Sequence, residues 1–344
     1  MSKLFPTSMD DVDASPGSRV SILMRTKDRP VLLVRAFASV LNQTHQDWHL
    51  YLVNDGGRPG PVDEICAQYA GAFGDRLTTI HHETSKGMEA ASNAALHASQ
   101  GDFIAVHDDD DAWHPHFLAR TVGFLNNASN ANCAAVAARC QVVMERIQGD
   151  MVVEEARMEW GYWRELIDFG GMLHTNCIPP ICLLIRRSVV DTIGEFNRHL
   201  PVLGDWDYNL RIMLAGDIGT INENLCYYHQ RSYSAEANVY GNSVGKGQTK
   251  HDIYGVYYAN SLIRPLLRDS PGHIGLMHIL LKRMSQQQEE IRWLNQQLSD
   301  QLSSQLRQFE PTLHTINQML RGPRWAWRKL YPFRRFIAKM RGRV

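Results

Sequence analysis

Short apolar runs alternate with helical patterns between residues 19 and 110. Buried strands are predicted at residues 19–25, 48–53, 76–81 and 103–107. Between them, apolar residues at steps of three or four predict helices at residues 30–41, 61–72 and 87–99. Strand–helix alternation with short connections predicts an α/β fold, in which helices flank a mostly parallel sheet.

The pattern becomes mixed beyond residue 132 and helical beyond residue 247. Strands are predicted at residues 133–143, 151–157, 181–187 and 219–229, with helices at 188–194 and 205–215. We therefore expect one large domain with two halves, followed by a helical extension. The expected segments are a flexible leader (1–18), the domain (19–247, with halves 19–131 and 132–247), a helical region (248–320) and a basic tail (321–344).

The helical region carries an apolar stripe. Its residues are Ile291, Leu294, Leu298, Leu302, Leu306, Phe309, Leu313, Ile316 and Leu320. Eight steps cover 29 residues, about 3.6 residues per step, which is the α-helical period. Pro311 interrupts the stretch, so we expect a break or kink near Glu310. The stripe has two interpretations: a helix packed on the main domain, or a coiled coil that joins two copies through residues 284–320.

The net charge of zero combines an acidic body with a basic end. Of 36 basic and 36 acidic residues, residues 321–344 hold nine basic and no acidic ones, so the remaining residues carry a net charge of −9. Trp325, Trp327 and Phe333 are interleaved with the cations, a pattern typical of segments that lie on anionic membrane surfaces. Nucleic-acid binding and a solvated basic end are the alternatives, and we favour the membrane.

Composition excludes several classes of protein. A hydrophobic content of 44% with 21% charged residues is ordinary for a globular protein. No apolar run reaches the ~18 residues of a membrane span, and the N-terminus has no apolar segment typical of a secretory signal. Six scattered cysteines predict reduced, mostly buried thiols. We expect a cytoplasmic protein that associates peripherally with the inner face of the cytoplasmic membrane.

Four consecutive aspartates, residues 108–111, follow the fourth predicted strand directly. Adjacent carboxylates repel one another unless a cation or water compensates their charge. In open α/β sheets, ligands bind at the C-terminal ends of the strands, where Asp55 is also expected. Carboxylate oxygens suit Mg²⁺ or Mn²⁺, so we interpret the run as a metal site rather than a solvated acidic turn.

Several short motifs occur in a fixed order along the chain. They are SILMRTKDRP (21–30), SVLNQT (39–44), NDG (54–56), Gly87 with Asn93, and HDDDD (107–111). Together they resemble the family 2 inverting glycosyltransferases with the GT-A fold, of the bacterial surface-polysaccharide type. The resemblance covers residues 20–233, about two thirds of the chain. It implies a Rossmann-like nucleotide-sugar half and a mixed acceptor half.

The resemblance also implies roles for individual residues. The nucleotide-sugar donor is expected to contact Thr26, Arg29, Asp55, Lys86, Asp108 and Asp109. A Mn²⁺ or Mg²⁺ ion is expected to bind Asp110, with Asp108 and His229 as further contacts. Asp205 matches the catalytic base, which takes the proton of the attacking hydroxyl group, and Asp207 is its rival.

Four positions depart from the pattern that is common in the family. Asn54 stands where an aspartate is common, Gly57 where a serine is common, and Ser92 where a phosphate-binding arginine is common. Gly204 replaces the glutamate that often precedes the base. None of these changes removes the metal-site aspartates or Asp205.

The chain is therefore expected to be a metal-dependent inverting glycosyltransferase. It would move a sugar from a nucleoside-diphosphate sugar to a lipid-linked glycan acceptor. A sugar nucleotidyltransferase of similar fold is one alternative, although residues 24–29 lack the glycine-rich loop that such enzymes use. A non-catalytic, membrane-docking assembly protein is the other. Turnover of a nucleotide-sugar donor would exclude the non-catalytic protein. Release of pyrophosphate would identify a nucleotidyltransferase.

Overall fold

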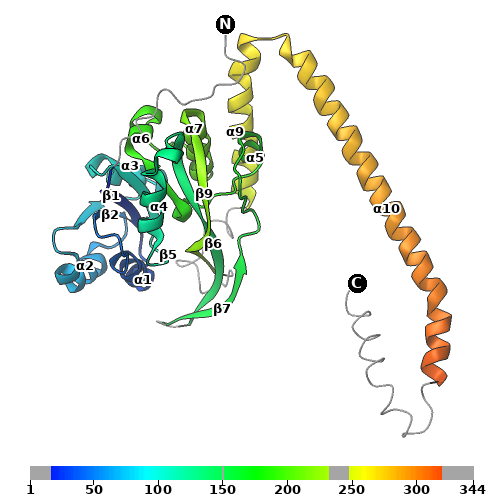
Figure 1. Cartoon of the computed structure of the whole chain (residues 1–344), viewed down its shortest axis with the longest axis horizontal. Helices are drawn as coiled ribbons and strands as arrows, with labels where there is room; N and C mark the ends of the chain where they lie inside the picture. The colour runs from blue at the N-terminus through cyan, green and yellow to red at the C-terminus, as the bar shows by residue number, and fades with distance from the viewer. Residues whose placement is uncertain (1–16, 149–150, 232–247, 320–344) are drawn as a thin grey trace. The chain divides into compact units, whose positions relative to one another are not determined.

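The computed structural model describes residues 17–148, 151–231 and 248–319 (Figure 1). Contacts divide the chain into two compact units, Met1–Ala259 and Asn260–Val344, so the division lies within α9 (Gln248–Asp269). The predicted domain limits stay predictions. Most of the predicted leader and all of the basic tail lie outside the described residues.

Four strands form the parallel half of the sheet. β1 (Val20–Thr26) pairs with β2 (Trp48–Asp55) and β4 (Phe103–Asp108), and β2 pairs with β3 (Leu77–His82). β1, β2 and β4 are buried along almost their whole length, which explains the run of apolar residues in each. The predicted α/β fold with a Rossmann-like first half is confirmed.

The other half of the nine-stranded sheet is mixed. β8 (Leu183–Arg186) lies antiparallel between β4 and β6 (Cys133–Gln148). β6 pairs in parallel with β9 (Asp217–Arg231) and antiparallel with β7 (Met151–Glu159), and Figure 1 shows β6 and β7 as a long curved ribbon. β5 (Ala112–Trp113) pairs with β9.

Helices pack on this sheet. They are α1 (Pro30–Leu41), α2 (Pro59–Phe73), α3 (Met88–Ala98), α4 (Phe117–Leu125), α5 (Phe169–His174), α6 (Arg187–Ile193) and α7 (Gly204–Ala215). α1 and α2 each begin with a proline, whose missing N–H costs no hydrogen bond in the first turn. α3 packs on β1 and β2, α4 packs on β6 and β8, and α7 contacts α5 and α6. α7 also contacts β6 and β9, and its first residues line one cavity with Arg25 of β1 and Asp108 of β4.

Several sequence predictions in the mixed half were inexact: β6 continues to Gln148 beyond its predicted end at residue 143, and α5 was not predicted. The strand predicted at residues 181–187 is shorter, because Pro180–Cys182 form a 3₁₀ turn (η2) and Arg187 already begins α6. Proline fixes its own backbone in a conformation that suits such a turn. The pattern also missed β5, which is too short for its period to be read.

α10 (His273–Met319) is one helix in the second unit. The expected break near Glu310 is absent, since the helix continues across Pro311. A proline removes one backbone hydrogen bond, and helical residues on both sides continue the helix here. The stripe from Ile291 to Phe309 is 52–61% exposed in the chain. None of the helices within the described residues is long and apolar enough to cross a membrane.

Candidate functional site

Three of the residues predicted to bind the donor come to one edge of the sheet. Thr26 ends β1, Asp55 ends β2 and Asp108 ends β4. Thr26 pairs with Asn54 and Arg25 pairs with Asp108 in the parallel register, so the three strand ends are level. This is the C-terminal edge of the parallel half, where open α/β sheets bind their ligands.

Thr26 and Arg29 hold the middle of the acidic run. Thr26 Oγ1 donates a hydrogen bond of 2.6 Å to Asp109 Oδ2, and Arg29 Nη2 lies 2.5 Å from Asp109 Oδ1. Arg29 Nη1 also donates to Asp110 Oδ2 at 3.2 Å, and Arg231 forms an ion pair with the same carboxylate. Two guanidinium groups therefore compensate the adjacent negative charges.

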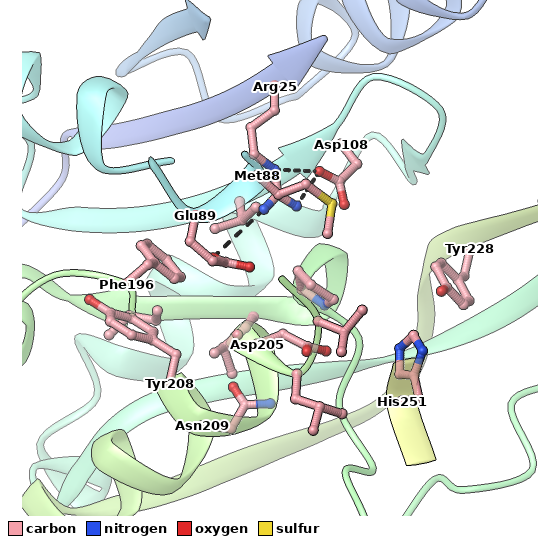
Figure 2. Close-up of a pocket in the computed structure, with 17 residues that line it drawn as sticks. Arg25, Met88, Glu89, Asp108, Phe196, Asp205, Tyr208, Asn209, Tyr228 and His251 are labelled. Carbon is pink, nitrogen blue, oxygen red and sulfur yellow. Dashed lines mark hydrogen bonds and ion pairs between the residues drawn. The ribbon is translucent and has the colours of Figure 1, made fainter. Parts of the chain in front are cut away.

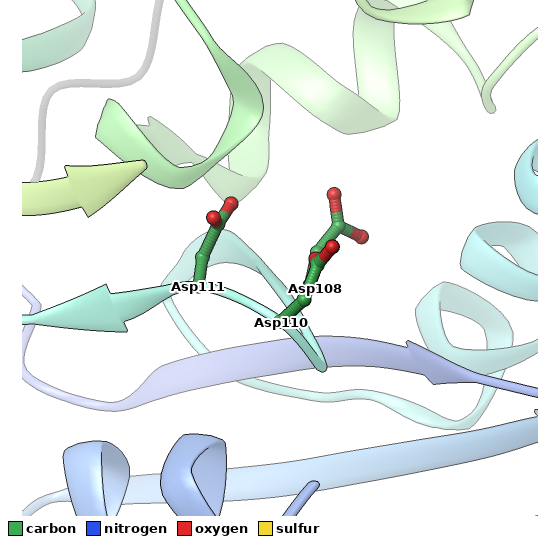
Figure 3. A group of neighbouring side chains, drawn as sticks. All are labelled: Asp108, Asp110 and Asp111. Atoms are coloured by element: carbon green, nitrogen blue, oxygen red, sulfur yellow. The ribbon is translucent and has the colours of Figure 1, made fainter. Parts of the chain in front are cut away.

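The carboxylates of Asp108, Asp110 and Asp111 gather beside the end of β4 (Figure 3), with ligand atoms within 4.8 Å of one another. Burial, together with the charges of Asp110 and Asp108, raises the pKa of Asp111 well above its usual range. Burial would also raise the pKa of Asp110, but Arg29 and Arg231 hold it below its usual range. A divalent cation fits this set of oxygen ligands, and its charge would relieve the repulsion at Asp111.

His229 reaches the acidic run through its backbone. Its N–H donates to Asp111 Oδ1 at 2.8 Å, and its Nδ1 lies 2.8 Å from Glu145 Oε2. Glu145 also pairs with Arg35 at 2.6 Å and Arg231 at 2.5 Å. Burial would raise the pKa of Glu145, but His229 and Arg35 lower it to about 2. The metal contact of His229 stays a prediction, because its ring lies outside the three-aspartate group found among the described residues.

Asp55 organises the turn that precedes α3. Its carboxylate lies 2.8 Å from His82 Nδ1 and accepts hydrogen bonds from Ser85 Oγ (2.6 Å) and from the backbone N–H groups of Lys86 (2.8 Å) and Gly87 (3.0 Å). Burial would raise the pKa of Asp55, but these hydrogen bonds lower it. The side chain of Lys86 is exposed. Asp55 and Lys86 therefore lie together, joined by the Lys86 backbone.

A cavity of about 130 Å³ lies beside this edge and is lined by residues of β1, β4, α3 and α7, among others (Figure 2). Asp108 and Asp205 both line it. Asn176 Nδ2 donates a hydrogen bond of 2.8 Å to Asp205 Oδ2. Burial raises the pKa of Asp205 above its usual range. The residue predicted to be the base thus shares one cavity with a residue predicted to bind the donor.

Asp207, the rival base, is engaged elsewhere. Its Oδ2 accepts a hydrogen bond of 2.9 Å from Arg211 Nε, and its Oδ1 accepts one of 3.1 Å from the Tyr258 hydroxyl. Asp207 does not line the cavity that contains Asp205. Because a general base must reach the proton that it removes, this geometry favours Asp205.

A guanidinium group that the sequence interpretation missed enters the cavity from β1. Arg25 Nε donates to Asp108 Oδ1 at 2.8 Å, and Arg25 Nη1 donates to Ser92 Oγ at 3.2 Å. Ser92 is the position where an arginine is common in the family, so β1 supplies a positive charge that α3 lacks. The signal in the sequence is a charged residue near the end of an otherwise uncharged strand.

Glu89, also missed, explains the glycine at position 204. A Cβ atom on Gly204 would lie 2.7 Å from Glu89 Cγ and closer still to the Glu89 carboxyl group. Leu203, directly before it, adopts a left-handed backbone conformation with φ of 68°. Such conformations are unfavourable for a branched side chain and often occur beside functional sites.

Comparison with protein families identifies the family of the chain. The model of glycosyl transferase family 2 matches residues 21–194, just over half of the chain. A PGL/p-HBAD biosynthesis glycosyltransferase of Mycobacterium bovis is 27% identical over 192 residues, which cover 56% of this chain and 68% of the relative. The putative colanic acid biosynthesis glycosyl transferase WcaA of Escherichia coli is 38% identical over 101 residues, covering 29% of this chain and 35% of the relative.

Solved structures show the same fold. S. aureus TarS 1–349 in complex with UDP-GlcNAc matches with a TM-score of 0.52 and 15% sequence identity. The match covers 64% of this chain and 61% of the TarS chain, so this chain spans less than two thirds of that protein. The GT-A fold expected from the sequence is confirmed.

Proposed function

The chain belongs to glycosyl transferase family 2, and from that premise we propose that it transfers a sugar, with inversion, from a nucleoside-diphosphate sugar to a hydroxyl group of a glycan acceptor. The observation that carries the proposal is that Asp108 and Asp205 line one cavity. A transferase needs its donor site and its base within one sugar's length of each other. Asp108 ends β4 at the ligand-binding edge, while Asp205 comes from the first turn of α7.

The nucleotide sugar is assigned to the C-terminal edge of the parallel strands. Thr26, Arg29, Asp55, Lys86, Asp108 and Asp109 would bind it there. The levelled ends of β1, β2 and β4 support this placement. Thr26 and Arg29 already fix Asp109, so they would act in part by holding the acidic run in place.

Asp110 and Asp108 are assigned as ligands of Mn²⁺ or Mg²⁺, with Asp111 beside them and His229 as a further contact. The gathered carboxylate oxygens support this assignment. When bound, such an ion would offset the negative charge of the departing diphosphate. Arg29 and Arg231, which flank Asp110, supply fixed positive charge to the same region.

Asp205 is assigned as the general base. One of its carboxylate oxygens would take the proton of the acceptor hydroxyl as the hydroxyl oxygen attacks the anomeric carbon. The bond between that carbon and the diphosphate breaks on the opposite face, and its electron pair leaves with the nucleoside diphosphate. The hydrogen bond from Asn176 orients Asp205 for this role.

The acceptor is proposed to be a lipid-linked glycan of a surface polysaccharide. Two relatives, a PGL/p-HBAD biosynthesis enzyme and a putative colanic acid enzyme, carry names that support this class of pathway. Residues 321–344 would hold the enzyme at the anionic inner face of the cytoplasmic membrane. The exposed stripe of α10 would join two copies of the chain over residues 284–320.

Donor turnover with and without Mn²⁺ tests the proposal. A panel of nucleotide sugars is incubated with the protein, and release of the nucleoside diphosphate is measured. Activity should require a divalent ion and should fall at least 100-fold in Asp110→Ala, while Asp191→Ala, which changes an exposed aspartate of α6, should leave it unchanged. Unaltered activity in Asp110→Ala, or release of pyrophosphate from a nucleoside triphosphate and a sugar phosphate, would overturn the proposal.

A further inference from the structure

Glu89 is a buried carboxylate that the proposed reaction does not yet use. It lies in the first turn of α3 with 6% of its surface exposed, and it lines the cavity that contains Asp108 and Asp205. Its one ion pair among the described residues is with Arg25 Nη1 at 4.0 Å. At that distance the pair leaves the carboxylate oxygens available for hydrogen bonds from a ligand.

The fold makes specific room for this carboxylate. Its side chain lies against Gly204, where any larger residue would displace it. Arg25 connects it to Asp108, because the same guanidinium group binds both carboxylates (Figure 2). A buried carboxylate costs free energy unless it is paired, so its position in a cavity suggests a binding role.

The sugar of the donor is the ligand that fits. In the proposed reaction, the diphosphate lies at the acidic edge and the anomeric carbon lies within reach of Asp205. The sugar ring must therefore occupy the cavity between Asp108 and Asp205, whose wall includes Glu89. A carboxylate can accept hydrogen bonds from two hydroxyl groups, which are the groups that distinguish one sugar from another.

We propose that Glu89 is a specificity-determining residue that accepts hydrogen bonds from hydroxyl groups of the donor's sugar. The inference rests on the proposed function and names a contact within the same site. Burial raises the pKa of Glu89 to about 7, against the opposing effect of Arg25, and hydroxyl donors would stabilise its ionised form. A sugar without the matching hydroxyl would leave the carboxylate unpaired and would be rejected.

The test compares a nucleoside diphosphate with its sugar conjugate. Calorimetry with Mn²⁺ measures the affinities of UDP, GDP and dTDP and of their common hexose conjugates for the full-length protein. In the wild type, one conjugate should bind more tightly than its parent nucleotide. Glu89→Gln should lower the affinity for that conjugate about tenfold or more and should change the affinity for the parent nucleotide less than about twofold.

Two further variants separate binding from a structural role. Gly204→Ala keeps the Glu89 carboxylate but displaces it. This variant should therefore lose affinity for the conjugate and keep its affinity for the parent nucleotide. Glu64→Gln changes an exposed glutamate of α2 and should alter neither affinity.

Three results would overturn the inference. The first is a Glu89→Gln variant that binds the conjugate as the wild type does. The second is a Glu89→Gln variant that loses affinity equally for the conjugate and for the parent nucleotide, which would indicate a structural role for Glu89. The third is a wild type that binds none of the three nucleoside diphosphates with Mn²⁺, which would overturn the proposed function as well.

Discussion

Arg25 and Asp108 pair directly across two neighbouring parallel strands, with a hydrogen bond of 2.8 Å from Arg25 Nε to Asp108 Oδ1. The guanidinium group donates to this carboxylate through two nitrogens, which fixes the Asp108 side chain at the edge of the cavity. Arg25 is the connection between the acidic run and α3, where it also binds Ser92.

Replacement of Arg25 should therefore disturb donor binding. Arg25→Met frees the Asp108 side chain and removes a positive charge beside the expected diphosphate, so the affinity for a nucleoside diphosphate with Mn²⁺ should fall about tenfold. Calorimetry measures the change. Arg58→Met, at an arginine whose side chain is 81% exposed, is the matched control and should bind as the wild type does. Equal affinities for Arg25→Met and the wild type would contradict the prediction.

Asp205→Asn should slow sugar transfer strongly without weakening the binding of the donor. An amide cannot take the acceptor's proton, so kcat should fall about 100- to 10,000-fold while the donor dissociation constant stays within about twofold. Because burial raises the pKa of Asp205, the rate of the wild type should decline on acidification at a higher pH than for an ordinary aspartate. Steady-state rates across pH, with calorimetry of donor binding, check both points. A variant with normal kcat would exclude Asp205 as the base.

Glu89 should make stability depend on pH. Its pKa in the fold, about 7, is raised above the ordinary value of 4.5, so folding favours the protonated form. This contribution is fully present below pH 4.5 and is lost as the pH rises through 7. The free energy of unfolding of the wild type should therefore fall relative to that of Glu89→Gln by up to about 3 kcal/mol between pH 4.5 and 8.

Urea unfolding of both proteins across this pH range measures the difference. Glu64→Gln is the control, and its difference from the wild type should stay constant because Glu64 is exposed. A constant difference for Glu89→Gln as well would show that Glu89 keeps an ordinary pKa in the fold.

The parallel half of the sheet could be predicted closely from the sequence because three of its four strands, β1, β2 and β4, are buried along almost their whole length. β1 and β4 each contain a run of three or four apolar residues, and α1 begins and ends where the pattern predicts. The mixed half was less predictable. Its β5 is two residues long and forms only through pairing with β9, which no local pattern reveals.

The acidic run could be predicted because its members are consecutive, whereas its partners are far away in the sequence. Arg25 and Asp108 are 83 residues apart, and Arg231 and Asp110 are 121 residues apart. Such pairs depend on which strands become neighbours in the sheet. A single sequence gives no measure of that, so Glu89, Glu145 and the partners of Arg25 emerged only from the fold.

The apolar stripe of α10 should join two copies of the chain. Leu294→Lys and Leu298→Lys each place a charge within the stripe, so they should convert a dimer into a monomer. Gln296→Lys adds the same charge on the other side of the helix and should leave the dimer intact. Light scattering after size-exclusion chromatography measures the mass. A monomeric wild type would contradict self-association, and donor turnover by all variants would show that the sheet domain is intact.

Deletion of residues 321–344 should release the protein from anionic membranes. The segment carries nine basic residues, each worth about 1 kcal/mol near anionic headgroups, whereas the rest of the chain carries a net charge of −9. The full chain should sediment with phosphatidylglycerol vesicles at low salt and less at high salt, and it should not sediment with phosphatidylcholine vesicles. The truncated chain should stay in solution in each case and bind the donor with unchanged affinity, because no residue assigned to the donor lies in the segment. Sedimentation of the truncated chain with the anionic vesicles would contradict this role for the tail.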